Sequence, residues 1–207
     1  MPGLARGFES LGRQALRESW SFEETLAEAL AVEISSRSDS SVRHRLREAR
    51  FPDLKTLDQF DFTTAEGIDS ALVAKLARGD WLERKGNIIL AGPVGMGKTH
   101  LAFALGIEAA KQRRRVAFLR AADLVRQLIE ARDTRELGRL TRRFDRFDLL
   151  ILDEVGFLPF HRDGGELLFN LIAHRYERRS LIVTTNLPFA EWPKRLWRRR
   201  EADHRSA

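Results

Sequence analysis

The sequence contains no cysteine among its 207 residues. This absence excludes disulfide bonds, catalysis by a thiol and zinc sites built from cysteine ligands. No apolar run is long enough to cross a membrane, and the first twenty residues lack the apolar core of a secretion signal. We therefore expect a cytoplasmic protein without a membrane partner, although a lack of cysteine does not by itself identify a compartment.

Acidic residues are fewer than basic ones, 30 against 36, and the net charge is +6 with a pI of about 10.2. Such an excess of positive charge favours contact with a polyanion such as DNA. Most of it, however, lies in the tail that follows Trp192. The basic residues of this tail are Lys194, Arg195, Arg198, Arg199, Arg200 and Arg205. The excess therefore describes the tail more than the folded body.

A glycine-rich segment separates a short apolar run, residues 88–91, from an apolar stretch of helical character, residues 101–105. Its pattern, G-x-x-x-x-G-K-T, lets backbone N–H groups turn inward around a polyphosphate, and the following helix adds its dipole. We expect Lys98 to reach the outer phosphates of ATP and the Thr99 hydroxyl to bind Mg²⁺. A chance glycine-rich turn is the alternative, but the complete motif between a strand and a helix favours a nucleotide site. The predicted nucleotide-binding residues are Gly92, Pro93, Val94, Gly95, Met96, Gly97, Lys98, Thr99 and His100.

A second apolar run, residues 149–152, ends in the carboxylates Asp153 and Glu154. It is typical of a parallel strand buried on both faces, and ligands bind at the carboxyl edge of such sheets. We expect Asp153 to anchor the magnesium held by Thr99, and Glu154 to act as the general base that orients the attacking water. Asn186, after a further strand at residues 181–184, is placed to hold that water or the γ-phosphate. An ordinary polar strand end and simple turn chemistry at Asn186 are the alternatives.

Strands and helices alternate through this part of the chain. This alternation predicts an α/β fold, a three-layer P-loop NTPase with a central parallel sheet and right-handed crossovers. The predicted strands are residues 88–91, 115–120, 148–153 and 181–184. The intervening helices include residues 123–132, a helix from about 134, and residues 165–179. The helix from 134 carries apolar residues on one side and arginines mostly on the other. As a DNA-contact face this is plausible, but ordinary exposed charge is the favoured interpretation.

The N-terminal fifty residues are predicted to form a small helical segment. Residues 1–20 show no clear period, so we expect a frayed start. A capping box at residues 21–24 begins a helix, a serine-rich break follows at 35–41, and a second, arginine-bearing helix runs from 42 to 49. Residues 55–62 are expected to be an extended linker. Another capping box at residues 63–66 predicts a helix that Gly79 ends.

Three separate motifs resemble one family. The phosphate loop with its extension to Ala102, the run LLILDEVGFLPF at 149–160, and YERRSLIVTTNLPFAEW at 176–192 are similar to the IstB-like ATPases, the transposition helpers of insertion sequences. These are AAA+ relatives of the DnaC helicase loader. The linker at 49–52 and 56–62 also matches, so the resemblance covers about residues 43–192. It implies an ATP-dependent, oligomeric DNA-binding protein that assists a transposase, with Asp153 and Glu154 as the Walker B pair and Asn186 as the sensor.

The resemblance stops after Trp192. We expect three parts, namely a helical segment 1–50, an ATPase domain 51–191 and an off-pattern basic tail 192–207. The family's last strand and C-terminal helical part, with its arginine that acts across a subunit interface, are then missing. In the AAA+ order 5-1-4-3-2 this leaves the strand before the phosphate loop at the sheet edge. ATP binding with much reduced hydrolysis is the expected consequence. A DnaC-type helicase loader is the alternative within the enzyme class. A non-hydrolysing interaction protein, or a decayed copy, is the alternative of another class.

Overall fold

The computed structural model describes residues 2–63, 65, 67–156 and 162–188. The chain divides into two compact units, Met1–Arg45 and Leu46–Ala207. Within the described ranges, no helix is both long and apolar enough to span a membrane. The predicted tail 192–207 lies outside the described residues, and the three predicted domain ranges stay predictions.

Two helices build the N-terminal unit, and two predictions about it are wrong. α1 (Pro2–Arg17) replaces the expected frayed start, and α2 (Phe22–Ala49) continues through the expected serine-rich break. Each serine lowers helix stability by only about 0.5 kcal/mol relative to alanine. Side-chain bonds also stabilise the helix in this region, for example from Arg37 Nε to Glu33 Oε1 at 2.7 Å. The capping box is confirmed, since Ser21 and Glu24 exchange hydrogen bonds at 2.7 and 3.2 Å immediately before α2.

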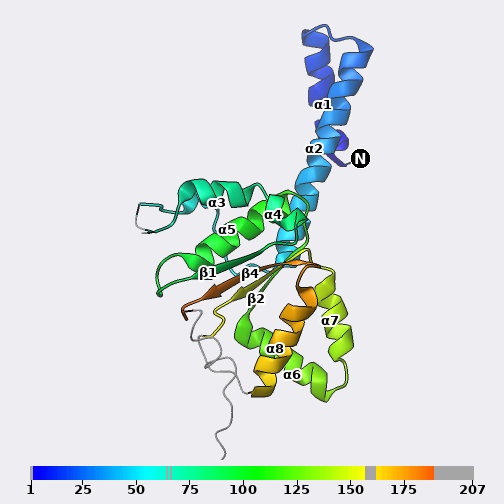
Figure 1. The fold of residues 1–207 in the computed structure, drawn as a ribbon. Helices are drawn as coiled ribbons and strands as arrows, with labels where there is room; N and C mark the ends of the chain where they lie inside the picture. The colour runs from blue at the N-terminus through cyan, green and yellow to red at the C-terminus, as the bar shows by residue number, and fades with distance from the viewer. Residues whose placement is uncertain (1, 64, 66, 157–161, 189–207) are drawn as a thin grey trace, which may run out of the picture. The chain divides into compact units, whose positions relative to one another are not determined.

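Four parallel strands form the sheet of the second unit (Figure 1). They are β1 (Asn87–Ala91), β2 (Val116–Arg120), β3 (Leu149–Asp153) and β4 (Ser180–Thr185), in the order β1-β4-β3-β2. Every residue of β3 and β4 is buried, and each strand has an apolar run, residues 149–152 and 181–183, as expected of parallel strands covered on both faces. The order confirms the prediction of a strand inserted between the phosphate-loop strand and the strand that ends in Asp153. Within the described sheet, β1 is an edge strand, as predicted.

Helices cover both faces of the sheet, which confirms the three-layer α/β fold (Figure 1). On one face lie α3 (Ser70–Ala77), α4 (Asp80–Glu83) and α5 (Lys98–Lys111), packed with Ile88, Ile151 and Ile182 of the strands. On the other lie α6 (Ala121–Asp133), α7 (Leu137–Asp145) and α8 (Arg162–Arg175), packed with Leu150 and Val183. The two apolar clusters share the sheet as their common layer.

The linker before the sheet differs from its prediction. It is not fully extended, because Leu57–Gln59 form a short 3-10 helix, η1. The next helix, α3, begins at Ser70 and not at the capping box of residues 63–66. Asp69 caps it by accepting from the Ala71 N–H at 2.8 Å, while the Thr63 N–H is already bonded to Asp61 at 2.8 Å. The predicted end of this helix is confirmed, since Gly79 follows it with φ of 83°.

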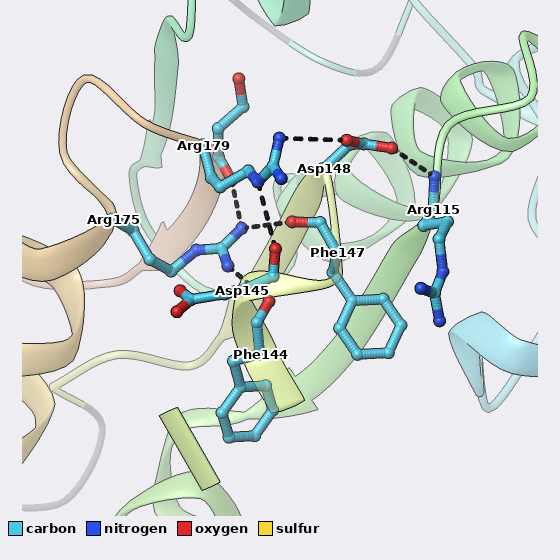
Figure 2. A network of polar contacts seen from close by, with 8 residues as sticks. Arg115, Phe144, Asp145, Phe147, Asp148, Arg175 and Arg179 are labelled. Atoms are coloured by element: carbon cyan, nitrogen blue, oxygen red, sulfur yellow. Dashed lines mark hydrogen bonds and ion pairs between the residues drawn. The ribbon is translucent and has the colours of Figure 1, made fainter. Parts of the chain in front are cut away.

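A buried arginine joins the ends of several elements at the amino edge of β3 and β4 (Figure 2). The Arg175 guanidinium is fully buried and donates to the carbonyls of Phe144 at 2.7 Å and Phe147 at 3.0 Å, with Ser180 O at 3.4 Å. Burial lowers the pKa of Arg175 to about 10, so it stays a cation at neutral pH. Beside it, Arg179 donates to the Asp145 carbonyl at 3.1 Å. A single cation thus satisfies backbone carbonyls left open where α7 ends.

Candidate nucleotide site

The phosphate loop connects β1 to the first turn of α5. Gly95 and Gly97 have φ of 91° and 74°, left-handed values that residues with a Cβ rarely adopt. Gly97 is also crowded, because a Cβ there would lie 2.7 Å from Phe60 Cε2. The loop therefore needs glycine at this position for its backbone shape and for the close approach of the linker.

Lys98 begins α5 and folds back over the loop. Its Nζ donates to the Pro93 carbonyl at 2.6 Å. Partial burial lowers the pKa of Lys98, and attraction to Asp153 opposes this effect. A cation held above the loop in this way is positioned to move from the loop carbonyl to a phosphate oxygen.

Asp153 lies at the end of β3 and receives two hydroxyl hydrogen bonds on one oxygen. Thr99 donates to Asp153 Oδ1 at 2.8 Å, and Thr184 of β4 donates to the same atom at 2.5 Å. Asp153 is 4% exposed. The predicted partners Thr99 and Asp153 are therefore brought together, although they lie far apart in the sequence. Hydroxyl and carboxylate oxygens are the donors that Mg²⁺ prefers, so this pair fits a magnesium ion.

Glu154 follows with its backbone held in an unusual conformation. Its φ is 60°, a left-handed value that costs energy for a residue other than glycine. Its N–H donates to Thr184 Oγ1 at 2.9 Å, and the next residue, Val155, donates to the Thr184 carbonyl at 2.9 Å. These two bonds from β4 fix the backbone at Glu154, which is exposed and lines the cavity.

A cavity of about 370 Å³ joins these groups. Of the predicted residues, Val94, Gly95, Gly97, Lys98, Thr99, His100, Glu154 and Asn186 line it, whereas Gly92, Pro93 and Met96 belong to the loop but not to its lining. The remaining lining residues are Lys55, Thr184 and Thr185. No group of three or more His, Asp and Glu side chains that could hold a metal occurs in the described part of the chain.

His100 has a structural contact within the chain in addition to its place in the cavity lining. Its Nε2 lies 2.8 Å from the Thr56 carbonyl, so this nitrogen donates. The ring also packs edge-on against Phe60, with centroids 5.2 Å apart. His100 thus anchors the linker to the phosphate loop.

The sequence profile of the family described as IstB-like ATP binding protein matches residues 1–201. The chain belongs to this family. The match extends beyond residues 43–192, the limits set by the sequence motifs, and includes the N-terminal helices. This IstB-like chain is therefore a member of the AAA+ P-loop ATP-binding proteins.

Proteins of bacterial insertion sequences are its relatives. A protein of insertion sequence IS21 from Pseudomonas aeruginosa is 42% identical over 192 residues, which are 93% of this chain and 72% of the relative. One from Sinorhizobium fredii is 38% identical and is covered to 65%, and one of IS232 from Bacillus thuringiensis is 36% identical and covered to 71%. The IstB-like chain thus spans between about two thirds and three quarters of the length of these relatives.

Solved structures show the same fold. AMPPCP-bound DnaA from Aquifex aeolicus is 27% identical with a TM-score of 0.53, over 64% of this chain and 42% of that one. DnaA bound to AMPPCP and single-stranded DNA matches with the same figures. The DnaC helicase loader matches with a TM-score of 0.57 at 21% identity, over 69% of this chain and 86% of that one. The last likeness shows the fold alone.

Three lining residues of the cavity in this IstB-like protein were not predicted, namely Lys55, Thr184 and Thr185. Thr184 connects Asp153 to the Glu154 backbone, yet threonine at the end of a strand is common and gives no separate signal. Lys55 comes from the linker and lines the cavity. A single lysine in a linker looks like ordinary surface charge, so the sequence gives no reason to single it out.

Proposed function

We propose that this IstB-like protein hydrolyses ATP and uses the cycle of binding and hydrolysis to assist a transposase in inserting DNA. The observation that carries the proposal is the shared oxygen Asp153 Oδ1, which Thr99 and Thr184 both bond, beside a cavity that Lys98, Glu154 and Asn186 line. In this arrangement Lys98 binds the outer phosphates and Asn186 positions the attacking water, while Thr99 and Asp153 would hold a Mg²⁺ ion that neutralises phosphate charge. Glu154 takes the proton of that water as the water oxygen bonds to the γ-phosphorus, and the bond from this phosphorus to the bridging β–γ oxygen breaks, so that ADP and inorganic phosphate are released.

Turnover by a single copy is proposed to be slow. No arginine is among the described residues that line the cavity, and an arginine reaching the transferred phosphate contributes on the order of 10³-fold or more to such reactions. A homo-oligomer, expected of the family, is also part of the proposal, as is a location in the cytoplasm, where the DNA lies.

The function is tested with a transposase of the IS21 type, since a protein of IS21 is a relative of this chain. Insertion of labelled transposon ends into plasmid DNA is measured with the transposase alone, with the full chain and ATP, and with the full chain and ADP. An increase that needs both the chain and ATP supports the proposal. If insertion is unchanged while the chain stimulates unwinding by a replicative helicase, the helicase-loader alternative replaces it.

DNA is the proposed polyanionic partner, and α7 is its proposed contact surface. The helix buries Phe144 and packs Leu137 and Leu140 inward, while Arg139, Arg142, Arg143 and Arg146 are exposed. A groove of about 760 Å³ between α6 and α7 includes all four arginines. Arg142 and Arg146 form no ion pair with any described residue, whereas Arg139 pairs with Glu136 at 3.0 Å. Arginines without carboxylate partners are suited to phosphate contacts.

Replacing Arg142 and Arg146 by alanine is expected to weaken DNA binding about equally for all sequences. Each lost phosphate contact lowers the dependence of log K on log salt by about 0.9, so the slope is expected to fall by about 2. Fluorescence anisotropy with a labelled duplex at several salt concentrations measures both effects. The matched control is Arg78→Ala with Arg84→Ala, which removes two exposed arginines on the opposite face of the sheet. Equal slopes for the two double variants would reject α7 as the contact surface.

A further inference from the structure

A second lysine reaches the nucleotide cavity from outside the phosphate loop. Lys55 lines the same cavity as Lys98, Glu154 and Asn186, although it belongs to the linker that leads into the ATPase fold. Its side chain is 49% exposed and has a weak ionic contact, with Asp53 Oδ2 3.9 Å from Nζ. It is thus a cation with access to the cavity and without a strong partner to hold it elsewhere.

The backbone next to Lys55 is fixed against the phosphate loop by two contacts. The His100 ring donates to the carbonyl of Thr56, the residue directly after Lys55, at 2.8 Å. Farther along, the Phe60 ring fills the space over Gly97 that a Cβ would otherwise occupy. Both contacts involve residues that flank Lys98 and Thr99, so the linker and the loop form one packed unit.

The linker segment is also braced internally. The Thr56 N–H donates to Gln59 Oε1 at 3.0 Å, and the Phe60 N–H donates to the Leu57 carbonyl at 3.0 Å, closing η1. The segment from Thr56 to Phe60 is therefore held at both ends and across its middle. Lys55 directly precedes this fixed segment, so its position relative to the cavity is adjusted mainly by its own side chain.

We propose that Lys55 is a second phosphate-binding lysine, which contacts the outer phosphates of the bound nucleotide beside Lys98. The inference rests on the proposed nucleotide function of this cavity. The described lining supplies two lysines and one carboxylate, Glu154, whereas a triphosphate brings several negative charges. The residues that line the cavity come from the phosphate loop, the linker and the polar strand ends, which favours contact between Lys55 and phosphates over contact with a base. His100 is the positioning residue, since it sets where Lys55 leaves the linker.

Binding of ATP to the full chain, measured by calorimetry in the presence of Mg²⁺, tests the contact. Lys55→Gln is expected to raise the Kd for ATP about tenfold, the usual effect of losing one charge-assisted hydrogen bond in a partly solvated site. Lys55→Arg keeps the charge and is expected to stay within about threefold of the natural protein. The Kd for adenosine is expected to be unaffected by either change. Lys75→Ala, which removes an exposed lysine from α3, is the matched control.

The role of His100 is tested by a double-mutant cycle. If His100 acts by positioning Lys55, then His100→Ala weakens ATP binding, and adding it to Lys55→Gln costs less than the sum of the two single effects. Fully additive effects would overturn the positioning role.

The outcomes also separate this inference from the proposed function. A folded natural chain that binds no ATP would overturn both. A natural chain that binds ATP, together with a Lys55→Gln variant of equal ATP affinity, would overturn only the role of Lys55. Equal losses of affinity for ATP and adenosine in Lys55→Gln would also overturn it, because they would indicate a disturbed fold and not a lost phosphate contact.

Discussion

Glu154→Gln is expected to leave ATP binding within about threefold of the natural protein and to lower its hydrolysis by on the order of 10² to 10⁴. The amide is close in size to the carboxylate and keeps a hydrogen-bond acceptor, but it cannot take a proton from water. The backbone of Glu154 is fixed by Thr184 independently of its side chain, so the turn is expected to persist. Single-turnover hydrolysis with excess protein measures the chemical step directly.

The control for this variant is Glu177→Gln, which neutralises an exposed carboxylate that is not part of the cavity lining. It is expected to hydrolyse ATP at the natural rate. If Glu154→Gln also retains the natural rate, Glu154 is not the general base, and another group must activate the water.

The second large effect is expected on stability. Arg175→Met removes the guanidinium that bonds the carbonyls of Phe144, Phe147 and Ser180 inside the core. Three buried acceptors would lose their donor, at a cost of about 3 kcal/mol or more. Since 1 kcal/mol corresponds to about 2–4 °C for a chain of this size, the Tm is expected to fall by about 10 °C. Thermal unfolding followed by circular dichroism measures the change.

Two further variants make the stability result interpretable. Arg178→Met replaces an exposed arginine close by in the sequence and is expected to change the Tm little. Arg175→Lys keeps the charge but loses the forked geometry, so it is expected to fall between the natural protein and Arg175→Met. Because the pKa of Arg175, about 10, lies far above neutrality, the loss is expected to be the same at pH 6 and pH 8. If the Tm of Arg175→Met lies within about 2 °C of that of the natural protein, water replaces the lost donors and the expected loss of stability is contradicted.

Much of the local structure around the cavity could be predicted because short sequence patterns determine it. Glycines at fixed spacing, a following helix and a run of buried strand residues ending in Asp153 and Glu154 are all readable within short windows. The strand order could not be predicted from such short patterns, and its prediction rests on the family resemblance. The sheet order β1-β4-β3-β2 agrees with it.

The errors arose where tertiary contacts or weak propensities decide the outcome. Serines at 35–41 looked like a break, but the flanking helix continues through them because their individual cost is small. The helix predicted to begin at residues 63–66 begins at Ser70, where Asp69 caps it. Thr184 and Lys55 reach the site through pairing of distant strands and through packing of the linker on the loop. No pattern within a short window contains that information.

The central claim is that residues 92–99, together with Asp153, form an ATP site. The direct measurement is equilibrium binding of ATP to the full chain with Mg²⁺, compared with Lys98→Ala. Loss of the Lys98 cation from a partly buried phosphate site is expected to weaken binding by about 30-fold or more, while the Tm without nucleotide stays the same. Saturable binding of one ATP per chain that Lys98→Ala largely abolishes is the predicted result. A folded natural chain that binds no ATP, or a Lys98→Ala variant that binds it equally tightly, would contradict the claim.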